Sequence, residues 1–211
     1  MVVLDPQGIS AQPVSTATRA AFESPLMPSW CAQMLHDPTL RPIASPNRQP
    51  KTSTEDSFVA ETLFSDSTIS AWQAFYRDVS SSGLRLELSQ TSQDNTPVAG
   101  EVILLLTLGR GMNGHTNVVH GGLIATILDE TMGMVANFHQ SPGMSAYTAT
   151  LNVSCKNPVP TPGAIVCRSW LEKRSGGRKV WLRGRVEDGS GTLFAEAESL
   201  CVEVKRKVPK L

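Results

Sequence analysis

One long amphipathic helix pattern, followed closely by strand patterns, restricts the fold most. From Gly121 to about His139, apolar residues recur at helical spacing along one half of the helical circumference, while Asp129 lies on the opposite side. Short turns rich in glycine and proline separate four strand-like segments, at residues 146–155, 164–172, 179–187 and 192–204. Short connections favour antiparallel neighbours, and a single amphipathic helix needs an apolar sheet face to cover. The predicted fold class is α+β, with an antiparallel sheet wrapped around one long central helix.

Three further patterns precede the long helix. Residues 84–88 alternate apolar and polar side chains, which predicts a half-buried strand. Residues 101–108 form a continuous apolar run, typical of a central strand. A short helix is predicted over residues 67–78, because apolar side chains recur there at spacings of three and four, at Ile69, Trp72, Phe75 and Tyr76.

The N-terminal part is rich in proline, with eight of the fourteen prolines in the first 50 residues. Proline disfavours regular helix and central strand. We therefore expect residues 1–55 to form an arm that is partly docked through Trp30 or disordered. The domain is expected to span residues 56–206, with a tail at 207–211.

Composition limits the possible partners and compartment. Nineteen Lys and Arg balance nineteen Asp and Glu, which argues against nucleic acid as the main partner. No run approaches 18 strongly apolar residues, so no membrane span is expected. Four scattered cysteines without metal-like spacing to the histidines predict reduced thiols and no metal. The start of the chain resembles no secretory signal and matches a mitochondrial transit peptide poorly, so a cytoplasmic protein is expected, with mitochondria as the alternative.

His120-Gly121-Gly122, at the start of the long helix pattern, carries the strongest chemical signal. Two glycines are poor helix formers, and they make sense if another molecule must approach the backbone closely. Free N–H groups and the positive helix dipole suit an oxygen that gains negative charge. The motif therefore indicates an oxyanion hole for an acyl carbonyl, the alternative being a plain glycine-rich turn.

The strand predicted over residues 146–155 separates apolar and polar residues by alternation. One face is expected to carry Tyr147, Ala149, Leu151 and Val153, and the other to carry Thr148, Thr150, Asn152 and Ser154. The hydroxyl and amide face would line either a site or solvent.

An ordered set of motifs resembles the hotdog-fold acyl-CoA thioesterase superfamily, most nearly the branch of thioesterase superfamily members 4 and 5. The set covers roughly residues 58–205. It comprises His120-Gly121-Gly122, Asp129, Thr148-Ala149-Thr150-Leu151-Asn152-Val153, Lys156-Asn157-Pro158, Gly177-Arg178-Lys179-Val180 and Ala195-Glu196-Ala197-Glu198 with Cys201-Val202. The resemblance implies a hotdog fold and hydrolysis of acyl-CoA, or a related acyl thioester, to free acid and thiol.

The resemblance also implies roles for individual residues. Asp129 would be the general base or the nucleophile, and Thr148 would position the attacking water. The backbone N–H of Gly121 would bind the thioester oxygen, and His120 would orient its loop. The residues that would contact substrate or CoA are Asn117 (with Asn113 as the alternative), Gly122, Ser154, Lys156, Arg178 and Lys179. Glu130 is expected to be a solvated charge on the helix surface.

Such hydrolysis requires water, a base and an oxyanion hole, and no metal or organic cofactor. A hotdog acyl-thioester hydratase or dehydratase and a non-catalytic acyl-CoA-binding module remain as alternatives. Gly121 and Asp129 are separated by roughly 12 Å along one helix, whereas reacting atoms must approach within about 3–3.5 Å. We therefore expect a homodimer or homotetramer in which Gly121 of one subunit faces Asp129 of another. The small residues Ala125, Gly133 and Ala136 would let the helices approach.

Overall fold

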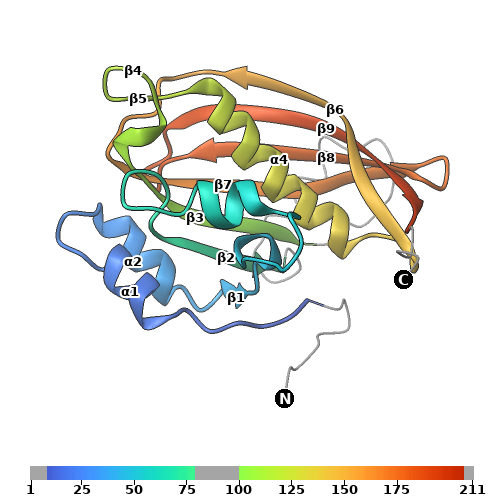
Figure 1. Ribbon diagram of the computed structural model, residues 1–211, viewed down its shortest axis with the longest axis horizontal. Helices are drawn as coiled ribbons and strands as arrows, with labels where there is room; N and C mark the ends of the chain where they lie inside the picture. Colours follow the sequence, from blue (N-terminus) through green and yellow to red (C-terminus); the bar gives the residue numbers. More distant parts are fainter. Residues whose placement is uncertain (1–8, 79–99, 207–211) are drawn as a thin grey trace.

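A seven-stranded antiparallel sheet carries the long helix α4 (Gly121–Phe138) across one face (Figure 1). The computed structural model describes residues 9–78 and 100–206. The strand order is β1 (Arg41–Ile43), β2 (Trp72–Arg77), β3 (Glu101–Leu108), β7 (Gly163–Ser175), β8 (Lys179–Glu187), β9 (Leu193–Lys205) and β6 (Met144–Cys155). The predicted α+β architecture, the long helix, the central strand and the four later strands are confirmed.

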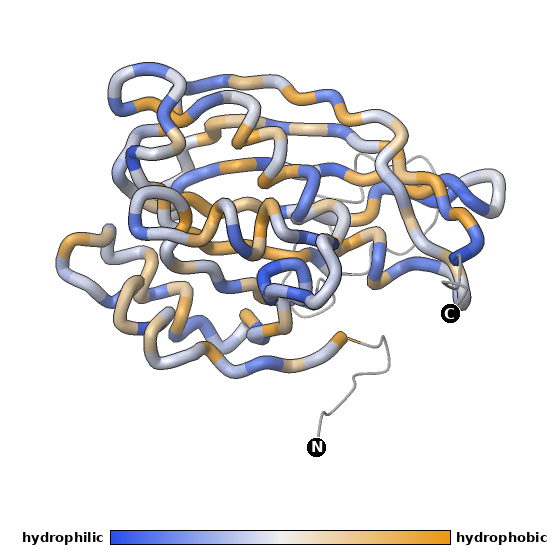
Figure 2. Tube along the Cα trace, in the orientation of Figure 1, coloured by the Kyte–Doolittle hydropathy of each residue, from blue (hydrophilic) through white to orange (hydrophobic). Residues whose placement is uncertain are grey.

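The apolar side of α4 packs into the main core. Leu123, Ile127, Leu128 and Met132 are buried against side chains from β3, β7, β8 and β9. Gly184 on β8 permits a close approach, because a Cβ there would lie 3.0 Å from a Leu128 methyl carbon. Figure 2 shows apolar residues gathered on α4 and the central strands, with polar residues on the connecting loops.

Residues 72–77 form strand β2, so the helix predicted over residues 67–78 is wrong. Trp72, Ala74 and Tyr76 face the main core beneath α4, while Phe75 faces a second apolar cluster on the opposite side of the sheet. Because both faces of β2 are buried, the apolar residues do not alternate with polar ones. Their spacing imitated a helical pattern.

Two short helices cover the sheet face opposite α4, although the prolines had led us to expect none. Helix α1 (Thr16–Phe22) is capped by Ser15, whose Oγ accepts the Thr18 N–H, and α2 (Ser29–His36) begins directly after Pro28. Both lie between prolines rather than across them. Their buried residues Phe22, Cys31 and Leu35 pack against Phe75, Ile103 and Leu105 in the second cluster. The division at residues 55 and 206 stays a prediction.

A half-buried arginine, Arg48, holds the connection between β1 and β2 in place. This connection contains η1 (Pro46–Arg48) and the π-helical turn η2 (Phe58–Thr62). The Arg48 guanidinium donates to three backbone carbonyl oxygens, those of Val59, Leu63 and Ile69. Burial lowers the pKa of Arg48 to about 10. The connection is thereby fastened over the core.

The strand predicted over residues 84–88 lies outside the described residues. Before α4, the chain forms the turn η4 (Arg110–Met112) and a small hairpin of β4 (Asn113–His115) and β5 (Val118–Val119). In the described parts, 9–78 and 100–206, no helix combines the length and apolar character needed to cross a membrane.

Candidate active site

The first turn of α4 presents one uncommitted backbone donor. His120 is the N-cap residue, and its Nδ1 accepts the Gly122 N–H at 2.9 Å. The Leu123 N–H donates to the His120 carbonyl at 2.9 Å. Within residues 9–78 and 100–206, nothing accepts the Gly121 N–H. Apart from its chain neighbours and the nearby helix backbone, no atom lies within 4 Å of the position of a Cβ on this exposed glycine. The geometry suits a carbonyl oxygen that develops negative charge.

A cavity of about 290 Å³ adjoins this helix end. Among its lining residues are Gly121, Ile124, Cys155, Lys156, Asn157 and Phe194. Lys156 extends from the end of β6 and pairs with Glu196, Nζ to Oε1 2.6 Å. The fold therefore brings the predicted residues Gly121 and Lys156 together.

Two asparagines flank the same end of α4 through the β4–β5 hairpin. Asn117 occupies the left-handed region at φ 56°, and its carbonyl oxygen accepts the Thr161 N–H at 3.0 Å. The Asn113 Oδ1 accepts the Thr161 hydroxyl at 2.5 Å. Asn113 is thus committed through its side chain, whereas Asn117 is held through its backbone.

Asp129 and Thr148 form a direct pair between α4 and β6. The Thr148 hydroxyl donates to Asp129 Oδ1 at 2.8 Å. Asp129 is half-buried and Thr148 is exposed, so the carboxylate is held in orientation while remaining accessible. A carboxylate fixed by one hydroxyl keeps further lone pairs free to accept a proton or attack a carbonyl carbon.

A β-bulge in β6 makes the predicted assignment of residues to its two faces wrong. Thr148 lies opposite Cys201 and Thr150 lies opposite Leu200, so Ala149 is an extra residue and the alternation changes phase. Thr148 therefore shares the helix-facing side with Leu151 and Val153. Tyr147, expected on the apolar face, is 62% exposed.

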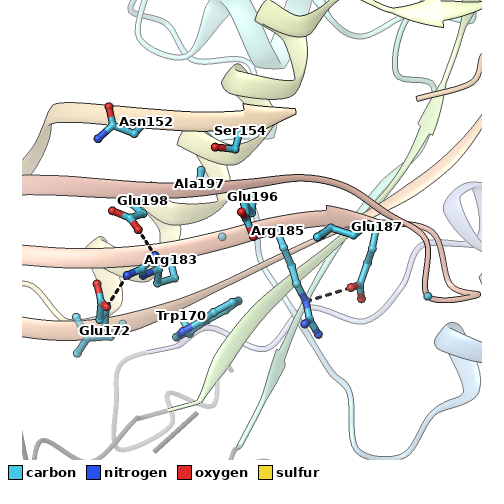
Figure 3. A pocket seen from close by; sticks show the side chains of 14 residues that line it. Asn152, Ser154, Trp170, Glu172, Arg183, Arg185, Glu187, Glu196, Ala197 and Glu198 are labelled. Carbon is cyan, nitrogen blue, oxygen red and sulfur yellow. Dashed lines mark hydrogen bonds and ion pairs between the residues drawn. The ribbon is translucent and has the colours of Figure 1, made fainter. Parts of the chain in front are cut away.

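Ser154 lies on the opposite sheet face from Asp129. Figure 3 shows its side chain beside Asn152 on β6, above polar residues of β8 and β9. There it lines a cavity of about 670 Å³ that also includes Trp170, Arg183, Glu196 and Glu198. The structure does not bring Ser154 to the Gly121 cavity within this chain.

Arg178 and Lys179 lie at the other end of the sheet from Lys156. Lys179 is opposite Val202 on β9, whereas Cys155, next to Lys156, is opposite Ala195. Seven residues of strand separate these rows, about 23 Å. The two basic groups therefore do not meet in one chain, although Lys179 lies near the Thr148 row.

Glu130 is not the solvated charge that we expected. It is half-buried, and Asn47 of η1 donates its Nδ2 hydrogen to Glu130 Oε2 at 2.6 Å. Burial raises the pKa of the Glu130 carboxyl, with further increases from Asp129 and Asp56, against the lowering effect of the Asn47 donor.

The expectation that Ala136 lets the helices of two subunits approach is also wrong, since Ala136 is buried in the core, whereas the surface at Gly133 is open.

Stability should depend on pH through Glu130. Because its pKa is raised on folding, its contribution is fully present below the unfolded pKa of about 4.3 and is lost as pH rises through the folded value. Glu130→Gln should therefore make the melting temperature fall less with rising pH than in the wild type. Melting curves from pH 4 to 8 measure this, with exposed Glu61→Gln as the matched control. Parallel curves for wild type and Glu130→Gln would contradict it.

The comparisons with known proteins agree with this arrangement. An antiparallel sheet wrapped around one helix is the hotdog architecture that the resemblance implied. Residues 116–195 match the family model described as Thioesterase superfamily. No group of three or more His, Cys, Asp or Glu residues suited to a metal ion occurs where the structure describes the chain.

Several relatives carry thioesterase names. Acyl-coenzyme A thioesterase THEM4 of Mus musculus is 34% identical over 113 residues, covering 53% of this chain and 47% of that protein. An uncharacterized mitochondrial protein of Candida albicans is 33% identical, covering 51% and 49%. A Bacillus halodurans protein, solved with CoA, has a TM-score of 0.45 and 26% identity, covering 48% and 66%. The chain spans about half the length of the curated relatives it matches.

Proposed function

We propose that this protein hydrolyses acyl-CoA thioesters to the free acid and CoA. The observation that carries the proposal is the uncommitted Gly121 N–H at the positive end of the helix that also bears the Asp129–Thr148 pair. The names of the THEM4 relatives support acyl-CoA as the substrate class.

In the proposed reaction, the thioester oxygen accepts the Gly121 N–H, which stabilises the negative charge of the tetrahedral intermediate. Asp129 either takes a proton from the attacking water or attacks the carbonyl carbon itself. Thr148 orients the Asp129 carboxylate and the water. The His120 Nδ1 accepts the Gly122 N–H and so keeps the first turn in place. The thiolate of CoA then leaves and takes up a proton, which Asp129 supplies when it has acted as the base. If Asp129 has acted as the nucleophile, water then hydrolyses the mixed anhydride and releases the free acid.

We propose further that the site is composite, formed by a homodimer or by a tetramer built from it. Gly121 and Asp129 are too far apart on one helix to act on one carbonyl. Strand β6 forms an edge of the sheet among the described residues, with 12 residues to pair. Antiparallel pairing of two β6 strands about a two-fold axis would bring the Lys156 end of one subunit toward the Arg178 end of its partner.

Hydrolysis is tested with a panel of aromatic, short-chain and long-chain acyl-CoAs and detection of the released thiol. Thiol release with turnover supports the proposal. Change in enoyl-thioester absorbance without thiol release would favour a hydratase or dehydratase. Binding of acyl-CoA with neither signal would favour a non-catalytic binding module.

Arg178→Ala should raise KM for acyl-CoA by about 3- to 30-fold and change kcat less, because a charge-assisted hydrogen bond to a CoA phosphate would be lost. Steady-state kinetics measure both constants. Lys173→Ala is the control, since its Nζ lies over the Trp181 ring rather than at the proposed site. An unchanged KM for Arg178→Ala would remove this residue from the CoA site.

For the compartment, we propose the cytoplasm. The Candida albicans relative is named as mitochondrial, so mitochondria are the alternative. Fluorescence microscopy of the chain with a C-terminal tag, alongside a mitochondrial marker, distinguishes the two.

A further inference from the structure

Two polar side chains are buried behind the bulge in β6. Ser199 and Cys201 face α4 from β9, each with 2% of its surface exposed, in a row that also holds Ala195, Ala197 and the ion-paired Glu203. A buried hydroxyl is costly unless it is hydrogen-bonded. The burial of these two side chains next to Thr148 is therefore not explained by packing alone.

The number of hydroxyl hydrogens decides which group donates each hydrogen bond in this cluster. Thr148 has one hydroxyl hydrogen, which it donates to Asp129. Ser199 also has one, which it donates to the Thr150 carbonyl at 3.2 Å. The Cys201 Sγ lies 3.8 Å from Thr148 Oγ1 and 3.9 Å from Ser199 Oγ. Since both hydroxyl hydrogens are used, the single thiol hydrogen is the one available to these oxygens, and Thr148 Oγ1 is the nearer acceptor.

The Cys201 thiol is suited to act as a hydrogen-bond donor. Burial raises the pKa of Cys201, and the charge of Asp129 raises it further, against the lowering effect of the two hydroxyls. The sulfur therefore keeps its hydrogen at neutral pH. A weak donor aimed at Thr148 Oγ1 occupies one of its lone pairs and so favours the rotamer in which the hydroxyl hydrogen points to Asp129.

The bulge gives Ser199 its role. Without the extra residue Ala149, Thr148 would face away from α4, because Leu151 and Val153 face toward it. The Thr150 carbonyl directly follows the extra residue, and the Ser199 hydroxyl binds it from the neighbouring strand. This contact supports the backbone shape that turns Thr148 toward the helix.

We propose that Ser199 and Cys201 are positioning residues for hydrolysis: Ser199 braces the bulge, and Cys201 orients the Thr148 hydroxyl toward Asp129. This inference rests on the proposed function, and it adds two buried residues to the machinery that act only through Thr148.

The first experiment compares single variants. Ser199→Ala and Cys201→Ala should each lower kcat by about 3- to 10-fold with little change in KM, the size expected for one lost hydrogen bond. Cys201→Ser keeps a donor and should retain kcat within about twofold. Cys167→Ala is the matched control, because this buried thiol also faces α4 but contacts the Ile127 carbonyl rather than Thr148.

The second experiment repeats these variants in a Thr148→Val background. If Ser199 and Cys201 act through Thr148, each should lose its effect on kcat there, a coupling that general loss of packing would not produce. Equal losses in both backgrounds, or no loss in the wild type, would overturn the inference. If an alanine variant does not fold, as judged by circular dichroism, Cys201→Ser is measured in its place. Its kcat should equal that of the wild type in the wild-type background, and that of Thr148→Val in the Thr148→Val background. Absence of thiol release by the wild-type protein from every acyl-CoA of the panel would instead refute the proposed function.

Discussion

Asp129→Asn is expected to lower kcat for acyl-CoA hydrolysis by about 10²–10⁴-fold or more, while the fold stays intact. The asparagine side chain is nearly the same shape and can still accept the Thr148 hydroxyl. It carries no negative charge, so it neither takes a proton from water nor attacks a carbonyl. Measurement of thiol release, with circular dichroism to check the fold, decides the result.

Two comparisons sharpen this experiment. Asp66→Asn makes the same chemical change on an exposed residue and should leave turnover unaltered. Thr148→Ala should cost less than Asp129→Asn, because water can replace an orienting hydroxyl in part. Turnover near the wild-type level in Asp129→Asn would exclude Asp129 as base or nucleophile.

Mixing two inactive variants should restore activity. Gly121→Pro removes the backbone N–H that would bind the thioester oxygen, and proline is well tolerated at the first position of a helix. Asp129→Asn removes the base. In a hybrid dimer, one site would combine both defects and the other would combine two intact halves. With random exchange of subunits, about a quarter of the wild-type activity should return.

The recovery should depend on subunit exchange. Mixing after brief partial unfolding and refolding should restore more activity than mixing at low temperature, and either variant treated alone serves as the control. Sedimentation should show a dimer or larger assembly for the active protein. Full activity in a species that sediments as a monomer at assay concentration would contradict the composite site.

Local periodicity was sufficient for the parts of the fold that bury one face. The stripe on α4 and the patterns of β8 and β9 report contact with a single apolar layer, and they were predicted to within a few residues. The His120-Gly121-Gly122 motif and Asp129 were also found from sequence, because their position relative to the helix start follows from the chain itself. Both belong to one continuous helix.

Strand β2 shows where this reasoning fails. Its residues are buried on both faces, and the second covering layer comes from α1 and α2, more than 30 residues earlier. A pattern of apolar residues records that side chains are buried but not how many layers bury them. Asn47 and Glu130 lie 83 positions apart in the sequence, so local periodicity could not predict their contact either.

The sequence by itself determined the long helix, the later strands and the carboxylate on the helix face away from the core. Only the tertiary structure decided that Thr148 meets Asp129. That contact depends on one extra residue in β6, and nothing in the alternation of residues 146–155 marks where the extra residue falls. The bulge is set by pairing with β9, where Ser199 binds the Thr150 carbonyl, so its position is a property of two strands rather than of one.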